Sequence, residues 1–406
     1  NEVDVAWARW GWQGGLSPAE RERVSADYVA LAHGLLPRLV DSLAGGIAYW
    51  PSSPMSGDTV GAHETRPGTS GDNHYWGVWH ESRPLEEFEK NVGRFMSEYG
   101  FQSFPEMLTV QSYTLPGDRD IDSDVMKAHQ RSAIGNRQVL RYMERDYVVP
   151  ADFEQFLYAS QVLQARATRL AFHAHRRRMP YCMGSLVWQL NDCWPVASWS
   201  TIDYYHRWKA AHYAARAACK PVIVSPLATD DRVELWVVSD LLRAFPATLR
   251  VELKDFSGRT RGKREARYNV KANTSGRAIT WSREELLDGA DAREVFAVIS
   301  LLREGVLLDE QYLYFTTLKE ARLPVAPRVS VEGFEREGRR YLRVATDALA
   351  LDVLFYLPDE ELHLSDNYIN LVPGQPLEVE VIRPTGDFDA SRVRFRHVGM
   401  SREFMN

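Results

Sequence analysis

The sequence predicts a multidomain protein in which a β/α domain with a parallel sheet precedes two β-sandwich domains. The 406 residues exceed what a single hydrophobic core usually holds. Over residues 1–220, short apolar runs alternate with long helical patterns, which is typical of β/α units. Beyond Lys220-Pro221 the apolar residues partly alternate with period two, as in sandwich strands. We therefore expect domains at 1–220, 221–322 and 323–406.

Two helices of the first domain have clear sequence signals. Ser17-Pro18-Ala19-Glu20 combines a serine N-cap, a proline at the first helical position and a glutamate at the third. This predicts a helix from Pro18 to His33. A second helix is expected over Ala151–Arg178, because its apolar residues recur at helical spacing and its last turn is rich in arginine.

Short apolar runs in both parts of the chain predict strands. In the first domain, the expected buried parallel strands are Gly46–Trp50, Asn73–Trp79, Arg94–Ser97 and Met183–Leu190. In the sandwich domains, the clearest strand-like runs are Val233–Val238, Thr248–Leu253 and Glu294–Leu302. The proline-flanked stretch around Leu323 is expected to join the two sandwiches.

Composition and missing motifs exclude several classes of function. The net charge of −6 and the isoelectric point near 6.0 give no reason to expect nucleic acid or an anionic membrane as a partner. Apolar runs stay shorter than the roughly 18 residues of a membrane span. The three cysteines lack the paired spacing of a disulfide framework or a zinc site. Without a P-loop, a G-x-G-x-x-G or a G-x-S-x-G motif, nucleotide cofactors and serine hydrolysis lose support.

Two carboxylates are the candidates for acid/base chemistry. Glu98 follows a predicted strand, among aromatic residues, and working residues of parallel β/α folds lie at such strand ends. Pairing with Arg94 is the alternative role for this residue. Glu2 supplies the second carboxylate, although a frayed terminal residue without a role is its alternative.

Aromatic rings beside carboxylates suit a sugar, whose C–H faces stack on indole. Trp76 and Trp188 lie in or near predicted strand ends and are expected in the site. By contrast, Trp50, Trp79 and Trp208 are expected in the core. His74 is surrounded by no metal-ligand motif, so a hydrogen-bonding role is expected for it.

Several segments together resemble the C-terminal part of a β-mannosidase of glycoside hydrolase family 2. Asn1-Glu2 resembles the end of the family's acid/base motif, and Ser97–Ser103 resembles its nucleophile motif. The remaining matching segments are Gly71–His80 (sixth strand), Met183–Asp203 (eighth strand and its loop) and Ser365–Tyr368 (a turn of the last sandwich).

The resemblance implies a fold and a reaction. The fold would be the C-terminal half of a (β/α)8 TIM barrel followed by two immunoglobulin-like β-sandwich domains. The reaction would be retaining hydrolysis that releases terminal non-reducing β-D-mannose, with Glu98 as nucleophile and Glu2 as acid/base. Asn1 would bond the 2-hydroxyl. The other implied substrate-binding residues are Trp10, His74, Trp76, Trp188 and Asn191. No metal and no organic cofactor is implied.

The resemblance also implies a partner, because family members carry the first barrel strands ahead of the Asn-Glu pair. We expect that N-terminal half to be supplied by the same or a separate chain. An exo-β-glucosaminidase of the same family and a non-catalytic carbohydrate-binding fragment remain alternatives. The excess of arginine over lysine favours a bacterial source, with a cytoplasmic or periplasmic location.

Overall fold

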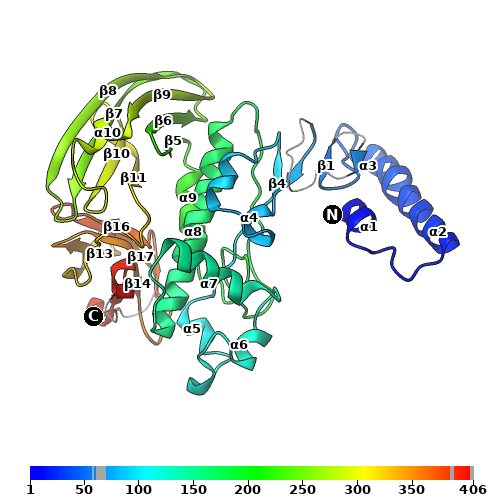
Figure 1. Ribbon diagram of the computed structural model, residues 1–406, viewed down its shortest axis with the longest axis horizontal. Coiled ribbons are helices and arrows are strands. Elements are labelled where there is room, and N and C mark those ends of the chain that lie inside the picture. Colours follow the sequence, from blue (N-terminus) through cyan, green and yellow to red (C-terminus); the bar gives the residue numbers. More distant parts are fainter. Residues whose placement is uncertain (57–58, 61–69, 385–387, 403–406) are drawn as a thin grey trace. The chain divides into compact units, whose positions relative to one another are not determined.

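The computed structural model describes residues 1–56, 59–60, 70–384 and 388–402 (Figure 1). The chain forms two compact units, which are described separately. The first comprises residues 1–99 and 180–187, and the second comprises residues 100–179 and 188–406. Among the described residues, no helix combines the length and the apolar composition needed to cross a bilayer.

The first unit begins with helices and ends on a short parallel strand pair. Its elements are α1 (Val3–Arg9), α2 (Pro18–Val29), the π-helix η1 (Ala30–Leu35), α3 (Leu36–Leu43), β1 (Met55–Ser56), β2 (Thr59–Val60), β3 (Asn73–His74), α4 (Gly77–His80), η2 (Leu85–Glu89) and β4 (Met96–Glu98). Ser17 and Glu20 form the expected capping box, so the predicted helix start is confirmed. The helical run passes His33 and continues to Leu43, because a π-turn and then α3 follow α2 directly.

The predicted barrel strands are shorter than the apolar runs suggested. β3 and β4 pair in parallel, and the expected strand Met183–Leu190 is reduced to an isolated parallel bridge between Ser185 and Met96 of β4. The run Asn73–Trp79 turns into α4 after its first residues. Gly46–Trp50 forms no strand, and this prediction was wrong. A strand needs a neighbour to accept its backbone hydrogen bonds, and the amide of Ile47 instead closes a turn on Ala44.

The second unit contains helices and two β-sandwiches. Its helices before the sandwiches are α5 (Met107–Val110), η3 (Pro116–Asp118), α6 (Asp124–Ala128), α7 (Gly135–Asp146), α8 (Phe153–Arg177) and α9 (Ala210–Ala218). α8 confirms the long predicted helix. It begins where the Asp152 side chain accepts a hydrogen bond from the Gln155 amide, and residues are buried along most of its length.

The first sandwich packs a three-stranded sheet, β5-β6-β9, over a four-stranded sheet, β11-β10-β7-β8. Its elements are β5 (Val222–Ala228), β6 (Arg232–Ser239), β7 (Phe245–Asp255), β8 (Thr260–Val270), β9 (Thr274–Ser282), α10 (Arg283–Leu287), β10 (Val295–Arg303) and β11 (Val306–Tyr314). β6 and β7 contain two of the predicted runs, and β10 contains the third except for its first residue, Glu294. Inward-facing Val, Leu and Ile of both sheets, such as Leu235, Leu249 and Leu301, form the core.

The second sandwich packs β12-β13-β17-β15 over β16-β14-β18. Its elements are β12 (Val329–Arg336), β13 (Arg339–Thr346), β14 (Ala350–Tyr356), β15 (His363–Leu364), β16 (Ile369–Leu371), β17 (Leu377–Arg383), η4 (Ala390–Arg392), β18 (Arg394–Arg396) and η5 (Val398–Arg402). The connections between α9 and β5 and between β11 and β12 contain the expected boundaries at 220 and 322, which remain predictions.

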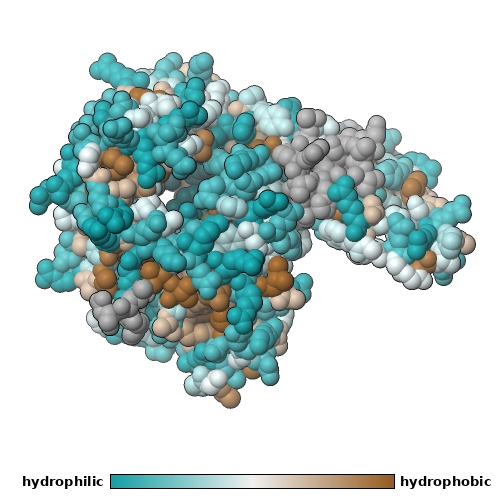
Figure 2. Space-filling view, in the orientation of Figure 1, coloured by the Kyte–Doolittle hydropathy of each residue, from teal (hydrophilic) through white to brown (hydrophobic). Residues whose placement is uncertain are grey.

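Hydrogen bonds join α8 to both sandwiches within the second unit. Toward the first sandwich, His173 Nδ1 lies 2.8 Å from the Ser225 hydroxyl oxygen in a buried contact. Toward the second sandwich, Tyr158 donates to the Asp352 carbonyl over 2.7 Å, and Tyr368 donates to Gln161 over 2.7 Å. The face drawn in Figure 2 is largely hydrophilic, with apolar residues gathered near the place where Figure 1 draws α7 and β14.

Candidate active site

Two carboxylates and an imidazole meet in the first unit. His74 Nδ1 lies 2.8 Å from Glu2 Oε1 and 3.3 Å from Glu98 Oε2. One carboxylate oxygen of each glutamate and a His74 nitrogen all lie within 4.8 Å of one another. Glu2 precedes α1, whereas His74 and Glu98 end the paired strands β3 and β4. The structure therefore brings together residues that are far apart in the sequence.

Backbone hydrogen bonds hold both glutamates in place. His74 is the register partner of Glu98, and the Tyr75 amide donates to the Glu98 carbonyl over 2.8 Å. Glu2 donates its own amide to the Ser53 carbonyl over 2.6 Å and has a φ of 59°, a left-handed conformation that residues other than glycine rarely adopt. Glu2 is thus ordered by the fold. Arg94, the alternative partner of Glu98, lies over the Tyr181 ring instead.

Glu98 is largely buried and accepts a hydrogen bond on each oxygen. Asn1 Nδ2 donates to Oε1 over 2.9 Å, and Trp76 Nε1 donates to Oε2 over 3.3 Å. Burial raises the pKa of the Glu98 carboxyl, and the negative charge of Glu2 adds to that rise, while His74, Asn1 and Trp76 oppose it. Donors on both oxygens favour the ionised form, because a charged carboxylate is a stronger hydrogen-bond acceptor than a protonated carboxyl.

The other ring nitrogen of His74 is linked to two residues that the sequence analysis missed, to Ser53 directly and to Asp72 through Ser53. His74 Nε2 lies 3.0 Å from Ser53 Oγ, and Ser53 donates to Asp72 Oδ2 over 2.5 Å. Asp72 also accepts from the hydroxyl of Ser97 over 2.5 Å. A sequence signal existed for Asp72, since it stands two residues before His74 and alternate residues of an extended chain share a face. Nothing in the pattern pointed to Ser53.

Glu2, His74 and Glu98 are also the residues that come close enough to bind a cation in the part of the chain that the structure describes. The same atoms already take part in hydrogen bonds with one another and with Asn1 and Trp76. A hydrogen-bonded site accounts for this geometry. It agrees with the hydrogen-bonding role expected for His74.

The three remaining residues that were predicted to bind substrate have exposed side chains. Trp10 caps the C-terminal end of α1. Trp188 and Asn191 belong to the second unit. There, the Trp188 carbonyl lies against Gly100, two residues after Glu98 in the sequence. The expected contact of all three with substrate remains a prediction.

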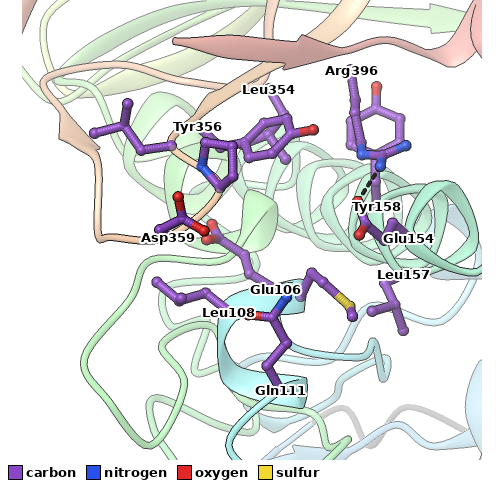
Figure 3. Close-up of a pocket in the computed structure, with 13 residues that line it drawn as sticks. Glu106, Leu108, Gln111, Glu154, Leu157, Tyr158, Leu354, Tyr356, Asp359 and Arg396 are labelled. Atoms are coloured by element: carbon purple, nitrogen blue, oxygen red, sulfur yellow. Dashed lines mark hydrogen bonds and ion pairs between the residues drawn. The ribbon is translucent and has the colours of Figure 1, made fainter. Parts of the chain in front are cut away.

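A separate pocket of about 160 Å³ lies in the second unit, between the start of α8, α5 and the second sandwich (Figure 3). Glu106, Gln111 and Asp359 line it together with Glu154, which pairs with Arg396 (Figure 3). Burial, and then the charge of Asp203, raise the pKa of Glu106 to about 8. The pocket contains none of the predicted site residues.

Comparison with known protein families supports the assignment of the two sandwiches. Residues 231–320 match the family model described as a mannosidase Ig/CBM-like domain. Residues 325–398 match the model described as an Ig-fold domain. Together they fall within the two predicted sandwich domains.

Full-length relatives extend the match to the first domain. The chain is 28% identical to β-mannosidase B of Aspergillus niger over 394 residues, which covers 90% of this chain and 44% of that protein. It is 33% identical to β-mannosidase B of Emericella nidulans over 245 residues, covering 56% of this chain and 28% of that protein. The crystal structure of a β-D-mannosidase from Dictyoglomus thermophilum matches with a TM-score of 0.81 and 27% identity, over 96% of this chain and 46% of that chain.

The resemblance to the β-mannosidases of glycoside hydrolase family 2 is thereby confirmed. The predicted fold is confirmed with it, as a barrel fragment followed by two immunoglobulin-like domains. The chain spans less than half the length of the β-mannosidases that it matches over most of its own length. The curated β-mannosidase relatives named above come from fungi, which does not support the expected bacterial source.

An exo-chitosanase from Amycolatopsis orientalis has the same fold, with a TM-score of 0.58 over 77% of this chain and 41% of that chain. Its identity to this chain is 16%, so the likeness concerns the fold alone.

Proposed function

We propose that this chain carries the two catalytic carboxylates of a retaining β-mannosidase that releases terminal non-reducing β-D-mannose. The observation that carries the proposal is the short distance, within 4.8 Å, between oxygens of Glu2 and Glu98. Retaining glycosidases hold their two carboxyl groups about 5–5.5 Å apart, whereas inverting enzymes leave about 6.5–9.5 Å for a water molecule. The spacing therefore favours double displacement.

Glu98 acts as the nucleophile in this proposal. It attacks the anomeric carbon and forms a glycosyl-enzyme, which requires an ionised carboxylate. The N–H donors of Asn1 and Trp76 support that form and fix the orientation of the carboxylate. Their bonds oppose the effect of burial on the Glu98 pKa.

Glu2 acts as the acid/base. It protonates the departing glycosidic oxygen, and then takes a proton from the water that cleaves the glycosyl-enzyme. Glu2 Oε1 lies 2.8 Å from His74 Nδ1, so the two groups can share that proton in a hydrogen bond. The two glutamates therefore have different surroundings, as a division between acid and nucleophile requires.

Asn1 would contact the 2-hydroxyl of the bound sugar, and Trp76 and His74 would line the terminal subsite. From the resemblance to the family, we further propose that Trp10, Trp188 and Asn191 contact the substrate. The names of the relatives support mannose as the sugar, since both the fungal proteins and the solved structure named above are β-mannosidases.

We also propose that further barrel strands, from the same or a separate chain, cover the open side of the first unit. The support is the small parallel pair β3–β4 and the exposure of apolar residues in the adjoining segment, 60% for Met183 and 53% for Leu186. Apolar surface of this kind is usually buried against neighbouring strands.

Hydrolysis assays test the function directly. Aryl β-mannoside, β-glucosaminide and β-galactoside should be offered to the chain with and without the remainder of the barrel. Preferential mannoside turnover, with retention of anomeric configuration by NMR, supports the proposal. Preferential glucosaminide turnover identifies the other member of the family, and sugar binding without turnover by the completed barrel identifies a binding module.

A further inference from the structure

A chain of four side chains runs from Asp72 through Ser53 and His74 to Glu2. Asp72 Oδ2 and Ser53 Oγ lie 2.5 Å apart, Ser53 Oγ and His74 Nε2 lie 3.0 Å apart, and His74 Nδ1 and Glu2 Oε1 lie 2.8 Å apart. His74 is almost completely buried and Asp72 is buried. The imidazole thus connects a buried carboxylate to the proposed acid/base.

The donors around Asp72 fix the direction of these hydrogen bonds. Its Oδ1 accepts from Trp50 Nε1 over 3.0 Å and from the Met55 amide over 2.8 Å. Its Oδ2 accepts from the hydroxyls of Ser53 and Ser97. Burial opposes ionisation of Asp72, but hydrogen bonds from the two serines, Met55 and Trp50 outweigh it and lower the Asp72 pKa.

The proton of the Ser53 hydroxyl is consequently assigned to Asp72. A serine hydroxyl has one proton to donate, and an ionised carboxylate only accepts. Ser53 Oγ also lies 3.5 Å from Ser97 Oγ, but the 2.5 Å contact with Asp72 is much shorter and takes the proton. In its contact with His74, Ser53 Oγ can then only accept. His74 Nε2 must supply the proton of that contact.

We propose that Asp72 and Ser53 are positioning residues that hold His74 protonated at Nε2, so that Nδ1 is the ring atom that shares a proton with Glu2. The inference deepens the proposed function, since it rests on Glu2 as acid/base. Neither residue contacts the reacting atoms in this arrangement. Both act through the imidazole, whose hydrogen-bonding partner on one nitrogen determines the role of the other.

This arrangement favours a proton on Glu2 at the moment when an acid is needed. With its hydrogen on Nε2, the ring presents a lone pair at Nδ1, which lies 2.8 Å from Glu2 Oε1 and 3.3 Å from Glu98 Oε2. Over the shorter of these contacts, the lone pair accepts a hydrogen bond from Glu2 when that carboxyl carries the proton. The opposite tautomer would donate to Glu2 and stabilise its ionised form instead. The ionisable groups around His74 are Glu2, Glu98 and, through Ser53, Asp72, and His80 lies in the field of Glu2.

The tautomer can be measured without any hydrolysis. Side-chain ¹⁵N NMR of histidine-labelled, deuterated protein reports which ring nitrogen is protonated, and His74→Gln assigns the signals. The experiment uses the protein in the form that carries the complete barrel. Wild type should show hydrogen on Nε2, and Ser53→Ala should lose that preference. Asp72→Asn, whose amide can donate to Ser53, should shift the population toward hydrogen on Nδ1.

Ser97→Ala is the matched control, because it removes a hydroxyl donor from the same Asp72 oxygen, and a 3.5 Å contact with Ser53 Oγ, while the contact between Ser53 and His74 stays. It should keep hydrogen on Nε2. Ser53→Thr retains the hydroxyl and should restore the wild-type tautomer. Thermal unfolding and the NMR spectrum of the remaining histidines show whether each variant is folded.

Kinetics then link the tautomer to catalysis. Ser53→Ala should lower kcat for an alkyl β-mannoside by about 10- to 100-fold with little change in KM, and less for an aryl substrate that needs little protonation. Ser97→Ala should stay within about 3-fold of wild type.

Hydrogen on Nδ1 in wild type, or equal effects of Ser53→Ala and Ser97→Ala on the tautomer, would overturn the inference. The expected tautomers in a protein that hydrolyses no β-mannoside would leave the hydrogen-bond chain standing and remove the proposed function. Mannoside hydrolysis by a protein in which Ser53→Ala leaves the His74 tautomer unchanged would support the proposed function and overturn the inference about Ser53.

Discussion

Asn1 and Glu98 are joined by a hydrogen bond of 2.9 Å between Asn1 Nδ2 and Glu98 Oε1. The bond links the residue beside one proposed catalytic carboxylate to the other carboxylate. It orients Glu98 and also opposes the rise that burial causes in its pKa. Asn1 therefore has a role at the nucleophile in addition to its proposed contact with the sugar.

Removal of that donor should move the acidic limb of the pH–activity profile. The nucleophile must be ionised, so activity falls as pH falls through the Glu98 pKa, which burial already raises. Asn1→Ala removes a stabilising donor and should shift this limb of kcat/KM to higher pH. Trp76→Phe, which removes the donor to Oε2, should shift it in the same direction. Trp12→Phe is the control at an exposed position that follows α1 and should leave the limb in place. An unmoved limb in both donor variants would show that another group controls it.

The two glutamates should respond differently to substitution. Glu98→Gln should abolish turnover of every substrate, because no glycosyl-enzyme can form. Glu2→Ala should lower kcat by about 10²- to 10⁴-fold for poor leaving groups and much less for activated aryl groups. Azide should then restore the rate, because it attacks the glycosyl-enzyme without a general base. Equal losses for good and poor leaving groups, without rescue by azide, would remove Glu2 from the acid/base role.

The sequence predicted those parts of the structure that depend on local signals. The capping box at Ser17 located the start of α2, helical spacing located α8, and period-two runs located strands of the first sandwich. The short strands β3 and β4 depend on neighbours from distant segments, so their lengths could not be read from hydrophobicity. Trp50 shows the same limit, since it was expected in the core. It is 49% exposed, and its indole N–H donates to Asp72 Oδ1.

The candidate site, too, contains residues that the sequence indicated and a residue that it could not indicate. Residue type and position indicated Glu98, Glu2 and His74, and the resemblance to a family added the nucleophile, acid/base and substrate-binding roles. Ser53 has no signal of its own, because its role depends on the fold bringing it within 3.0 Å of His74 and 2.5 Å of Asp72.

Gly100 should not tolerate a side chain. A Cβ at this position would lie 2.1 Å from the Trp188 carbonyl oxygen, a backbone atom that cannot rotate away. Gly100→Ala should therefore displace the Trp188 backbone and destabilise the protein by about 1–3 kcal/mol. Gly117→Ala is the control, because no heavy atom lies within 4 Å of the Cβ built there. Urea unfolding compares the two, and equal stability would show that the two backbone segments separate without cost.

Glu106 should make the stability of the second unit depend on pH. Its pKa is raised from 4.5 to about 8, chiefly by burial and then by the charge of Asp203. A carboxyl that binds its proton more tightly in the folded state stabilises that state fully at low pH. This contribution to the free energy of unfolding is lost as pH rises from about 4.5 to about 8. Glu106→Gln removes this titration and keeps the shape of the side chain. Relative to wild type, the variant should gain on the order of 1–3 kcal/mol in free energy of unfolding between pH 5 and pH 8.

Asp359→Asn, exposed at the rim of the same pocket (Figure 3), is the matched control and should leave the pH dependence unchanged. Urea midpoints at a series of pH values measure both variants. A constant difference between Glu106→Gln and wild type over this range would mean that Glu106 is as well solvated in the folded protein as in the unfolded chain.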